Sequence, residues 1–315
     1  MTKEIGGYIE FEHYHGEMFH EQAIKLNSGR NCLVYLIRAK GIKKIIIPYY
    51  LCDCIEDVCR KENVETRYYH VRLDFLPEDI ELTDDEWLYI VNYYGQLSKK
   101  QIIEYKHKYD RVILDNAHAY FEEPICGVDT LYTCRKFFGV PDGGILYTDA
   151  KTEVKEIDES YKRLSFLAGR FERTGREFYD FSQENEKRFY NEPLKLMSVL
   201  TENILRSLDY NRIKQQRNEN WQYLDEFLKH NNKLKLTIPY GAFMYPLMTD
   251  DAASIRKKMI EDKIYIPHLW PGRFSSIWGT DTEQRLADDI LPLPCDQRYT
   301  VSDMSIIIKA IQKYC

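Results

Sequence analysis

Short apolar segments alternate with segments of helical spacing along the first half of the chain. Six runs are rich in Ile, Val and Tyr and are short enough to be strands, at 43–50, 66–71, 88–94, 111–115, 130–134 and 143–148. Apolar positions with helical spacing occur at 30–41, 51–63 and 98–109. This alternation predicts an α/β fold, in which helices cover both faces of a mainly parallel sheet.

The second half of the chain has a different pattern. Residues 151–230 are highly charged and carry helical periodicity, most clearly from 191 onward. Beyond them, the segments 233–248, 252–270 and 302–315 read as a smaller α+β unit. We therefore expect a large domain over residues 1–210 and a small C-terminal α+β domain over residues 211–315.

Composition narrows the class of protein. The net charge of −6 gives no reason to expect a nucleic-acid or membrane partner. No apolar run has the length of a membrane span, and the segment MTKEIGGYIE lacks the apolar core of a signal peptide, so we expect a cytoplasmic protein. The only cysteine cluster, CDCIEDVC at 52–59, lacks the second Cys-x-x-Cys pair of a zinc site and has the period of one helix, so we expect no metal.

Candidate chemistry lies where strands end, because ligands of open α/β sheets bind beyond the carboxyl ends of the strands. The first such place is the turn Ser28-Gly29-Arg30, directly before the helical segment. Free N–H groups at a helix start beside an arginine can hold a phosphate, and Gly29 lets it approach the backbone. A helix start capped by Asn27 or Ser28 explains the same residues, and by itself that is the commoner meaning of such a turn.

The second place is the end of the run Val-Ile-Leu at Asp115. A carboxylate at the edge of a core is costly unless a cation or hydrogen-bond donors meet it. His118 follows three residues later and can face the same ligand. An Asp that caps the following turn is an equally good interpretation of this residue alone.

The third place is the segment YTCRKFFGVPDGG, residues 132–144. Thr133 and Lys136 stand at the end of a strand, and an extended backbone would point the side chains of Arg135 and Lys136 to opposite faces. The glycines and proline of 139–144 then predict a tight turn into the next strand. A loop lysine is usually solvated, but a desolvated one can form a Schiff base with an aldehyde.

One ligand satisfies all three strand ends, since it has a phosphate, a ring nitrogen and an aldehyde. That ligand is pyridoxal 5′-phosphate (PLP). The chain resembles fold-type-I PLP enzymes and, within them, the DegT/DnrJ/EryC1/StrS sugar aminotransferases. The resemblance rests on four motifs in the order of that family: SGR (28–30), VNYYGQ (91–96), LDNAHA (114–119) and KFFGVPDGG (136–144).

The resemblance implies a role for each matching residue. Lys136 would form the Schiff base and later move a proton, and Asp115 would pair with the ring nitrogen. His118 would lie against the ring or its phenolic oxygen. The residues implied for the phosphate are Ser28, Gly29, Arg30 and Thr133.

Several positions depart from the family pattern. Cys52 stands where an aromatic residue normally stacks on the ring, so Tyr50, or its neighbour Tyr49, is expected to take that place. Asn92 replaces a usual His, and Leu131 a frequent Ser. In the segment 170–193, only Asn191 resembles the phosphate contact that a partner subunit supplies in the family.

The family's chemistry implies an aminotransferase. It would carry an amino group from a donor such as glutamate to a nucleotide-linked keto sugar for surface polysaccharide. The resemblance also implies a homodimer, with a partner-facing helical segment from about residue 151. Two alternatives stay open: a non-catalytic binding or regulatory module, and a PLP-dependent sugar dehydratase, in which the position of Lys136 is usually His.

Overall fold

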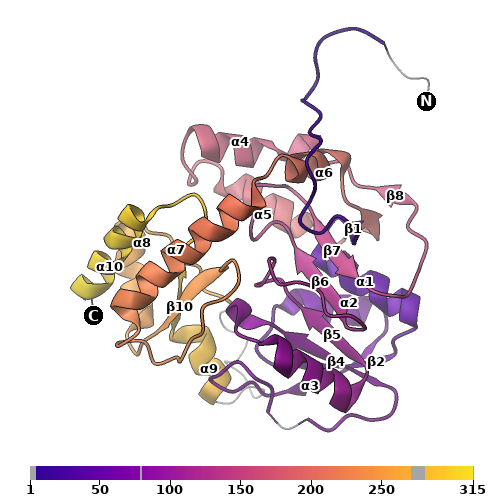
Figure 1. Cartoon of the computed structure of the whole chain (residues 1–315), viewed down its shortest axis with the longest axis horizontal. Coiled ribbons are helices and arrows are strands. Elements are labelled where there is room, and N and C mark those ends of the chain that lie inside the picture. The colour runs from indigo at the N-terminus through magenta and orange to yellow at the C-terminus, as the bar shows by residue number, and fades with distance from the viewer. Residues whose placement is uncertain (1–4, 79, 271–280, 315) are drawn as a thin grey trace.

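A large sheet forms the body of the molecule (Figure 1). The computed structural model describes residues 5–78, 80–270 and 281–314. Within these residues the sheet has nine strands in the order β3-β2-β4-β5-β6-β7-β1-β9-β8. The strands are β1 (Ile24–Leu26), β2 (Lys44–Pro48), β3 (Glu65–Tyr69), β4 (Glu86–Val91), β5 (Val112–Asp115), β6 (Asp129–Thr133), β7 (Gly144–Tyr147), β8 (Glu156–Ile157) and β9 (Lys195–Leu196).

Strand direction decides where the strand ends meet. Strands β3, β2, β4, β5 and β6 are parallel to their neighbours in that order. Strand β7 is antiparallel to both β6 and β1, so β1 runs parallel to β6. The carboxyl ends of β1, β2, β4, β5 and β6 therefore lie at one edge of the sheet. The predicted α/β class is confirmed, and all six predicted strands are present.

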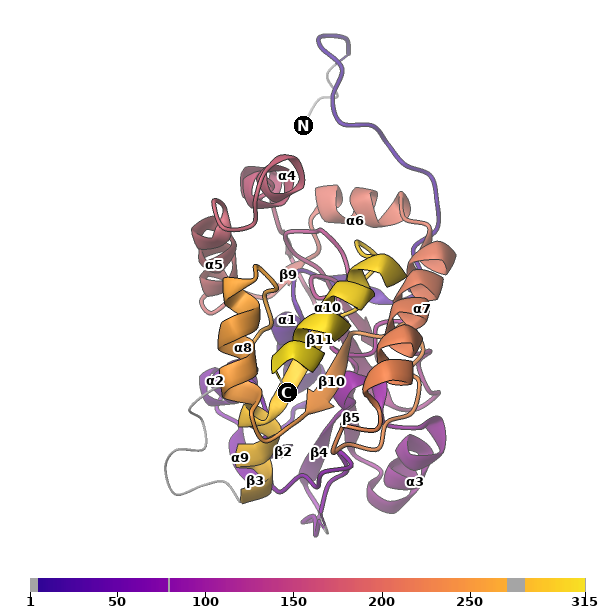
Figure 2. The ribbon, with the colours of Figure 1, turned by 90° about the vertical axis from the view of Figure 1, so that its left-hand side faces the viewer.

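Helices α1 (Gly29–Lys40), α2 (Asp53–Lys61) and α3 (Lys99–Tyr109) connect the first strands, as the helical spacing predicts. Strand β3 lies on one side of β2, whereas β5 lies on the opposite side of β4. Right-handed crossovers therefore place α2 and α3 on opposite faces of the sheet, as Figure 2 shows. Covered on both faces, the central strands are almost continuously apolar.

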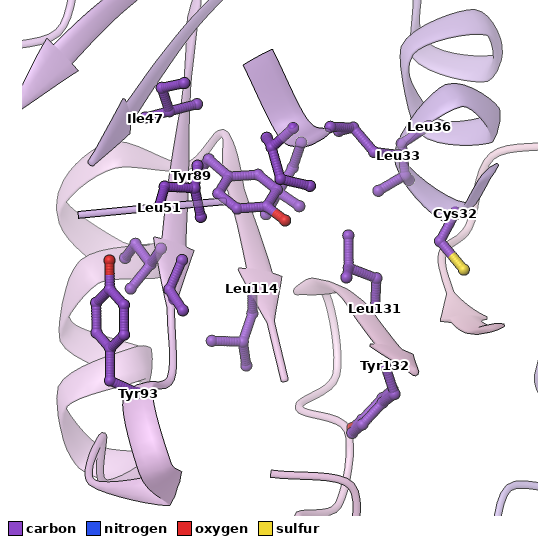
Figure 3. Close-up of a cluster of buried hydrophobic side chains, with 14 of the residues drawn as sticks. Cys32, Leu33, Leu36, Ile47, Leu51, Tyr89, Tyr93, Leu114, Leu131 and Tyr132 are labelled. Carbon is purple, nitrogen blue, oxygen red and sulfur yellow. The ribbon is translucent and has the colours of Figure 1, made fainter. Parts of the chain in front are cut away.

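The core of the sheet is closely packed and rich in tyrosine. Figure 3 shows Tyr89 of β4 among Leu33 and Leu36 of α1 and Leu131 of β6, and none of these side chains is more than 2% exposed. The predicted strand 88–94 ends at Val91, because Tyr93–Gly95 turns into a 3₁₀ helix in which Tyr94 has φ 53°.

The rest of the chain adds helices and a second, two-stranded sheet (Figure 2). Its elements are α4 (Ser165–Glu172), α5 (Tyr179–Arg188), α6 (Val199–Arg206), α7 (Tyr210–Leu228), β10 (Met244–Met248), α8 (Ala252–Glu261), α9 (Asp281–Asp288), β11 (Ile290–Pro294) and α10 (Val301–Tyr314). A separate apolar cluster joins α7, both strands, α8 and α10. The boundary at residue 210 stays a prediction, and α7 begins there. The segment predicted at 302–315 is α10, except that Cys315 lies outside the described residues.

None of the helices in the described ranges is both long and apolar enough to span a bilayer.

Candidate active site

The three strand ends singled out in the sequence come together at one edge of the sheet. Ser28 and Gly29 follow β1, Asp115 ends β5, and Lys136 follows β6. A Cβ atom added to Gly29 would lie 3.8 Å from Cβ of Thr133, so the start of α1 and the end of β6 are neighbours. Burial raises the pKa of Asp115 and the charge of Lys136 opposes that rise, so these two side chains are also within electrostatic reach.

The amine of Lys136 lies in a protein-lined recess that remains open to solvent. Its Nζ is 5.5 Å from the ring centroid of Phe243. Burial lowers the pKa of Lys136, and the negative charge of Asp115 only partly opposes this. A cavity of about 350 Å³ borders the lysine, and residues of α4, α5 and the segment 296–298 form its other walls. Lys136 is therefore an amine with a lowered pKa, partly enclosed by protein, that a ligand can reach from solvent.

The backbone around Lys136 is a turn. The expectation that Arg135 and Lys136 point to opposite faces of an extended strand is wrong, because the strand ends at Thr133. The guanidinium of Arg135 pairs with the carboxylate of Glu186 in α5, and that carboxylate also acts on the charge of Lys136. The charge of Glu186 thus acts on both cations.

A buried arginine that sequence reasoning missed holds the turn from behind. Arg217 of α7 is 1% exposed and donates to the carbonyl oxygen of Phe137 at 3.0 Å. It also donates to the carbonyl of Ala242 at 2.7 Å, next to Phe243. Arg217 therefore fixes the residue after Lys136 relative to the aromatic ring that faces the amine. A lone arginine in a charged helical segment gives no sequence signal for this contact.

The carboxylate of Asp115 is buried and hydrogen-bonded on both oxygens. Tyr89 donates its hydroxyl to Oδ2 at 2.7 Å, and the backbone N–H of Ala117 donates to Oδ1 at 2.8 Å. The second bond is the turn cap considered as an alternative for this residue. The two interpretations are compatible, because the capped carboxylate also lies in the electrostatic field of Lys136.

His118 lies in an aromatic stack behind the site. Its ring is nearly parallel to Phe243, with centroids 4.3 Å apart and an interplanar angle of 22°. Trp270 also stacks on the His118 ring, with ring centroids 6.0 Å apart. Burial, with the charge of Lys136, lowers the pKa of His118 well below its usual value, so the imidazole is neutral. Its buried Nδ1 has no hydrogen-bond partner among the described residues.

The start of α1 is a capped helix end with a cation beside it. The Ser28 hydroxyl accepts from the N–H of Asn31 at 3.2 Å, which is the predicted N-cap. The guanidinium of Arg30 lies over the ring of Tyr190, 4.7 Å from its centroid, and 3.8 Å from Oε2 of Glu186. The buried Nε atom of Arg30 has no hydrogen-bond partner in the described part of the chain. Sequence reasoning missed Glu186, which is one of three acids in α5.

Cys52 and Tyr50, two further residues predicted at the cofactor site, each have a hydrogen-bond partner within the chain. Cys52 caps α2 and accepts from the N–H of Cys54 at 3.4 Å. A hydrogen bond from the Cys54 thiol, and the charge of Lys136, lower the pKa of Cys52. Tyr50 donates to the carbonyl oxygen of Leu286 at 3.0 Å and packs edge-on against Trp270. Its role as the stacking aromatic stays a prediction.

The other two assignments also stay predictions. Asn191 is exposed just after α5 and close to Tyr190, so in this chain it follows the residue that covers Arg30. Tyr49, the alternative to Tyr50, stacks on Tyr68 at 4.9 Å and on His70 at 4.7 Å.

Comparison with solved structures identifies the fold. DesV from S. venezuelae, in a complex with a ketimine intermediate, matches 93% of this chain and 84% of its own at a TM-score of 0.66 and 14% identity. The match to a DegT DnrJ EryC1 StrS aminotransferase from Brucella abortus covers 94% of this chain and 89% of that protein, with a TM-score of 0.62 and 12% identity. The match to NtdA from Bacillus subtilis, solved with bound cofactor PMP, covers 96% of this chain and 78% of that protein, with a TM-score of 0.68 and 14% identity.

The resemblance to this group of aminotransferases is therefore confirmed at the level of the fold. No protein-family profile matches the chain, and no curated protein matches it in sequence.

Proposed function

We propose that this chain is a PLP-dependent aminotransferase. The observation that carries the proposal is the convergence of Lys136, Asp115 and the start of α1 at one edge of a sheet with the aminotransferase fold. An amine, a buried carboxylate and a helix N-terminus are the three groups that an aldehyde, a ring nitrogen and a phosphate require. NtdA, which has the same fold, was solved with PMP bound.

The residues at this edge fit the cofactor in chemistry. Lys136 would hold the aldehyde carbon, and Asp115 would hold a proton on the ring nitrogen. The N–H groups at the start of α1, with Thr133 and Arg30, would hold the phosphate. Two buried atoms without partners among the described residues, Nε of Arg30 and Nδ1 of His118, are available to a ligand.

When bound, the cofactor would supply an electron sink for the bonds at the donor's α-carbon. Lys136 would take the proton from that carbon, since a lowered pKa leaves more of its amine neutral and able to act as a base. Asp115 would remain the charged partner of the ring nitrogen, kept in place by the donors Tyr89 and Ala117. The walls of the cavity beside Lys136 would limit the entry of water.

The finer assignment extends the likeness to the fold neighbours. We propose a cytoplasmic homodimer that takes an amino group from a donor such as glutamate. The acceptor would be a nucleotide-linked keto sugar used for surface polysaccharide. The support for a sugar is that CalS13, which shares the fold, is described as a sugar aminotransferase. The lysine retained at position 136 favours transamination over the dehydratase alternative.

Borohydride trapping tests the proposal. Reduction of the protein with bound PLP should fix the cofactor on Lys136, and mass spectrometry of peptides should find it there. Lys136→Ala should lose the label and keep the fold, because this side chain opens into the cavity. Lys187→Ala, which removes an exposed lysine of α5, should keep the label. A label on another lysine, or no PLP binding by the wild type, would overturn the proposal, and the second result would favour a non-catalytic module.

A further inference from the structure

The phosphate site proposed above already contains an acid from the same chain. The carboxylate of Glu186 lies between two arginines, with Oε1 paired to Nη1 of Arg135 and Oε2 3.8 Å from Nη1 of Arg30. Arg30 is the second residue of α1, and Arg135 stands next to Lys136. Glu186 therefore bridges the two elements that would hold the phosphate and the aldehyde.

The charge of this acid depends on the same cations. Burial alone would raise the pKa of Glu186, but the charges of Arg135, Arg30 and Lys136 outweigh it and lower the pKa. Glu186 is thus an anion at neutral pH. A phosphate monoester carries a charge of about −1.5 to −2 at pH 7, so it would meet a like charge if Glu186 stayed in place.

The two arginines are only partly satisfied by this carboxylate. Their side chains are 12% and 14% exposed, and the Nε atoms of both Arg30 and Arg135 are buried without a partner among the described residues. Each guanidinium has five N–H donors, whereas a carboxylate offers two oxygens. A phosphate offers three terminal oxygens and can accept paired bonds from arginine.

The side chain of Glu186 also has room to move out of the site. Its side chain is 45% exposed, in contrast to the two arginines it joins. The helix that carries it is anchored by its neighbour Asn185, which donates to the carbonyl of Pro141 at 2.9 Å and accepts from Arg163 at 3.1 Å. The carboxylate can therefore turn toward solvent by side-chain rotation while α5 stays attached.

We propose that Arg30 and Arg135 together form the binding site for a phosphate monoester, and that Glu186 is its internal competitor, displaced when the phosphate binds. This inference rests on the proposed function for the identity of the ligand, but the site itself is defined by the three side chains. It adds Arg135 to the phosphate contacts and gives Glu186 a role in setting the affinity.

Binding measurements on Glu186→Gln test this competition. The variant keeps the shape of the side chain and removes its charge. PLP should bind about five- to tenfold more tightly to it in equilibrium dialysis, since ion pairs that are partly exposed contribute modestly. Pyridoxal, which has the aldehyde but no phosphate, should gain much less than PLP, because Glu186 affects the aldehyde end only through its charge on Lys136. Glu184→Gln, an exposed acid two residues earlier on α5, is the matched control and should behave as wild type.

Inorganic phosphate separates this inference from the proposed function. Calorimetric titration with phosphate alone should show tighter binding to Glu186→Gln than to wild type. Adding Arg135→Gln should abolish that gain, because it removes half of the arginine pair. If phosphate behaves this way but PLP does not bind, the anion site stands and the proposed function falls.

Three results would overturn the inference. One is weaker or unchanged phosphate binding by Glu186→Gln, which would mean that the acid only holds the arginines in place. Another is an equal gain for pyridoxal and PLP, since the effect would then lie at the aldehyde end. The last is persistence of the gain after Arg135→Gln.

Discussion

The hydroxyl of Tyr89 donates a 2.7 Å hydrogen bond to Oδ2 of Asp115. Tyr89 is the third-from-last residue of β4, and its fully buried ring lies among leucines of α1 and β6 (Figure 3). Asp115 is the last residue of the adjacent strand β5. A side chain in the core of the sheet thus hydrogen-bonds to the acid at the edge of the sheet.

Tyr89→Phe should destabilise the cofactor-free protein by about 2 kcal/mol at pH 7, because the buried carboxylate loses a donor. Burial already raises the pKa of Asp115, and losing this donor should raise it further. The cost of the substitution should therefore be largest at neutral pH, where Asp115 is ionised, and should become smaller as the pH falls and Asp115 takes up a proton. Urea unfolding at several pH values measures this.

Tyr69→Phe provides the control. Tyr69 is also buried, but its hydroxyl donates to the neutral carbonyl oxygen of Tyr89 at 2.8 Å. Its substitution should cost a similar amount at every pH between 4 and 7. Equal pH dependence in both variants would mean that the bond from Tyr89 does not govern the ionisation of Asp115.

Asp115→Asn should leave PLP bound and slow the chemistry. Asparagine has nearly the same shape, so packing and the covalent link to Lys136 should survive. Without the negative charge, the ring nitrogen would lose its proton and accept electrons poorly. The exchange of the donor's α-proton with deuterium, followed by NMR, should slow by about a hundredfold. Exchange at the wild-type rate would leave Asp115 as a turn cap alone.

Asp142 should make the protein less stable as pH rises from about 4 to 6. Its side chain is fully buried in the turn after Lys136, where it accepts two hydrogen bonds from Ser198, each of 3.1 Å. Burial, reinforced by the charge of Asp158, raises the pKa of Asp142 from 3.8 to about 6. Between these values the folded state holds a proton that the unfolded state releases, so stability falls with rising pH, by on the order of 2–3 kcal/mol for this group.

Asp142→Asn should remove this part of the pH dependence. The unfolding free energy of the variant minus that of the wild type should increase between pH 4 and 6.5 and then level off. Urea unfolding at half-unit steps measures the difference. A constant difference over this range would show that Asp142 titrates normally.

The proposed homodimer should depend on α4 and α5. Helix α4 has no buried residue, and Phe171, Tyr179 and Phe181 are 94%, 60% and 50% exposed. Exposed aromatic side chains of this kind are typical of interfaces. Sedimentation should find a dimer at micromolar concentration, and Phe171→Glu combined with Phe181→Glu should convert it to a monomer.

Phe227→Glu is the matched control, since Phe227 of α7 is 46% exposed outside this surface. It should leave the dimer intact. A wild-type monomer saturated with cofactor at micromolar concentration would contradict the proposal.

The strand ends of the site were predictable from sequence, whereas the contacts behind them were not. Asp115 and Lys136 follow apolar runs, and parallel strands bring such ends to one edge whatever lies between them. Glu186 and Arg217 reach the site from helices, 51 and 80 residues along the chain from the residues they contact, Arg135 and Phe137. Only tertiary packing selects them from many similar charges.

The shortest strands were also not predictable from the sequence. Strands β8 and β9 contain two residues each, which is too few for an alternating pattern to show. The interior of the turn after Lys136 was also hidden, because the glycines and proline of 139–144 predict a tight turn but not that Asp142 within it is fully buried.

The glycine at position 144 has a consequence for ligand length. A Cβ atom placed there would lie 2.4 Å from the carbonyl carbon and oxygen of Ser28, so β7 and the start of α1 touch through a hydrogen atom. The turn that carries Lys136 leads into β7, so this contact places the backbone of the turn relative to the helix start, and the side chain of Lys136 spans the remaining distance. The backbone on both sides of the proposed ligand therefore cannot move apart easily, and a pyridoxal analogue with one extra methylene before the phosphate should bind more weakly than PLP.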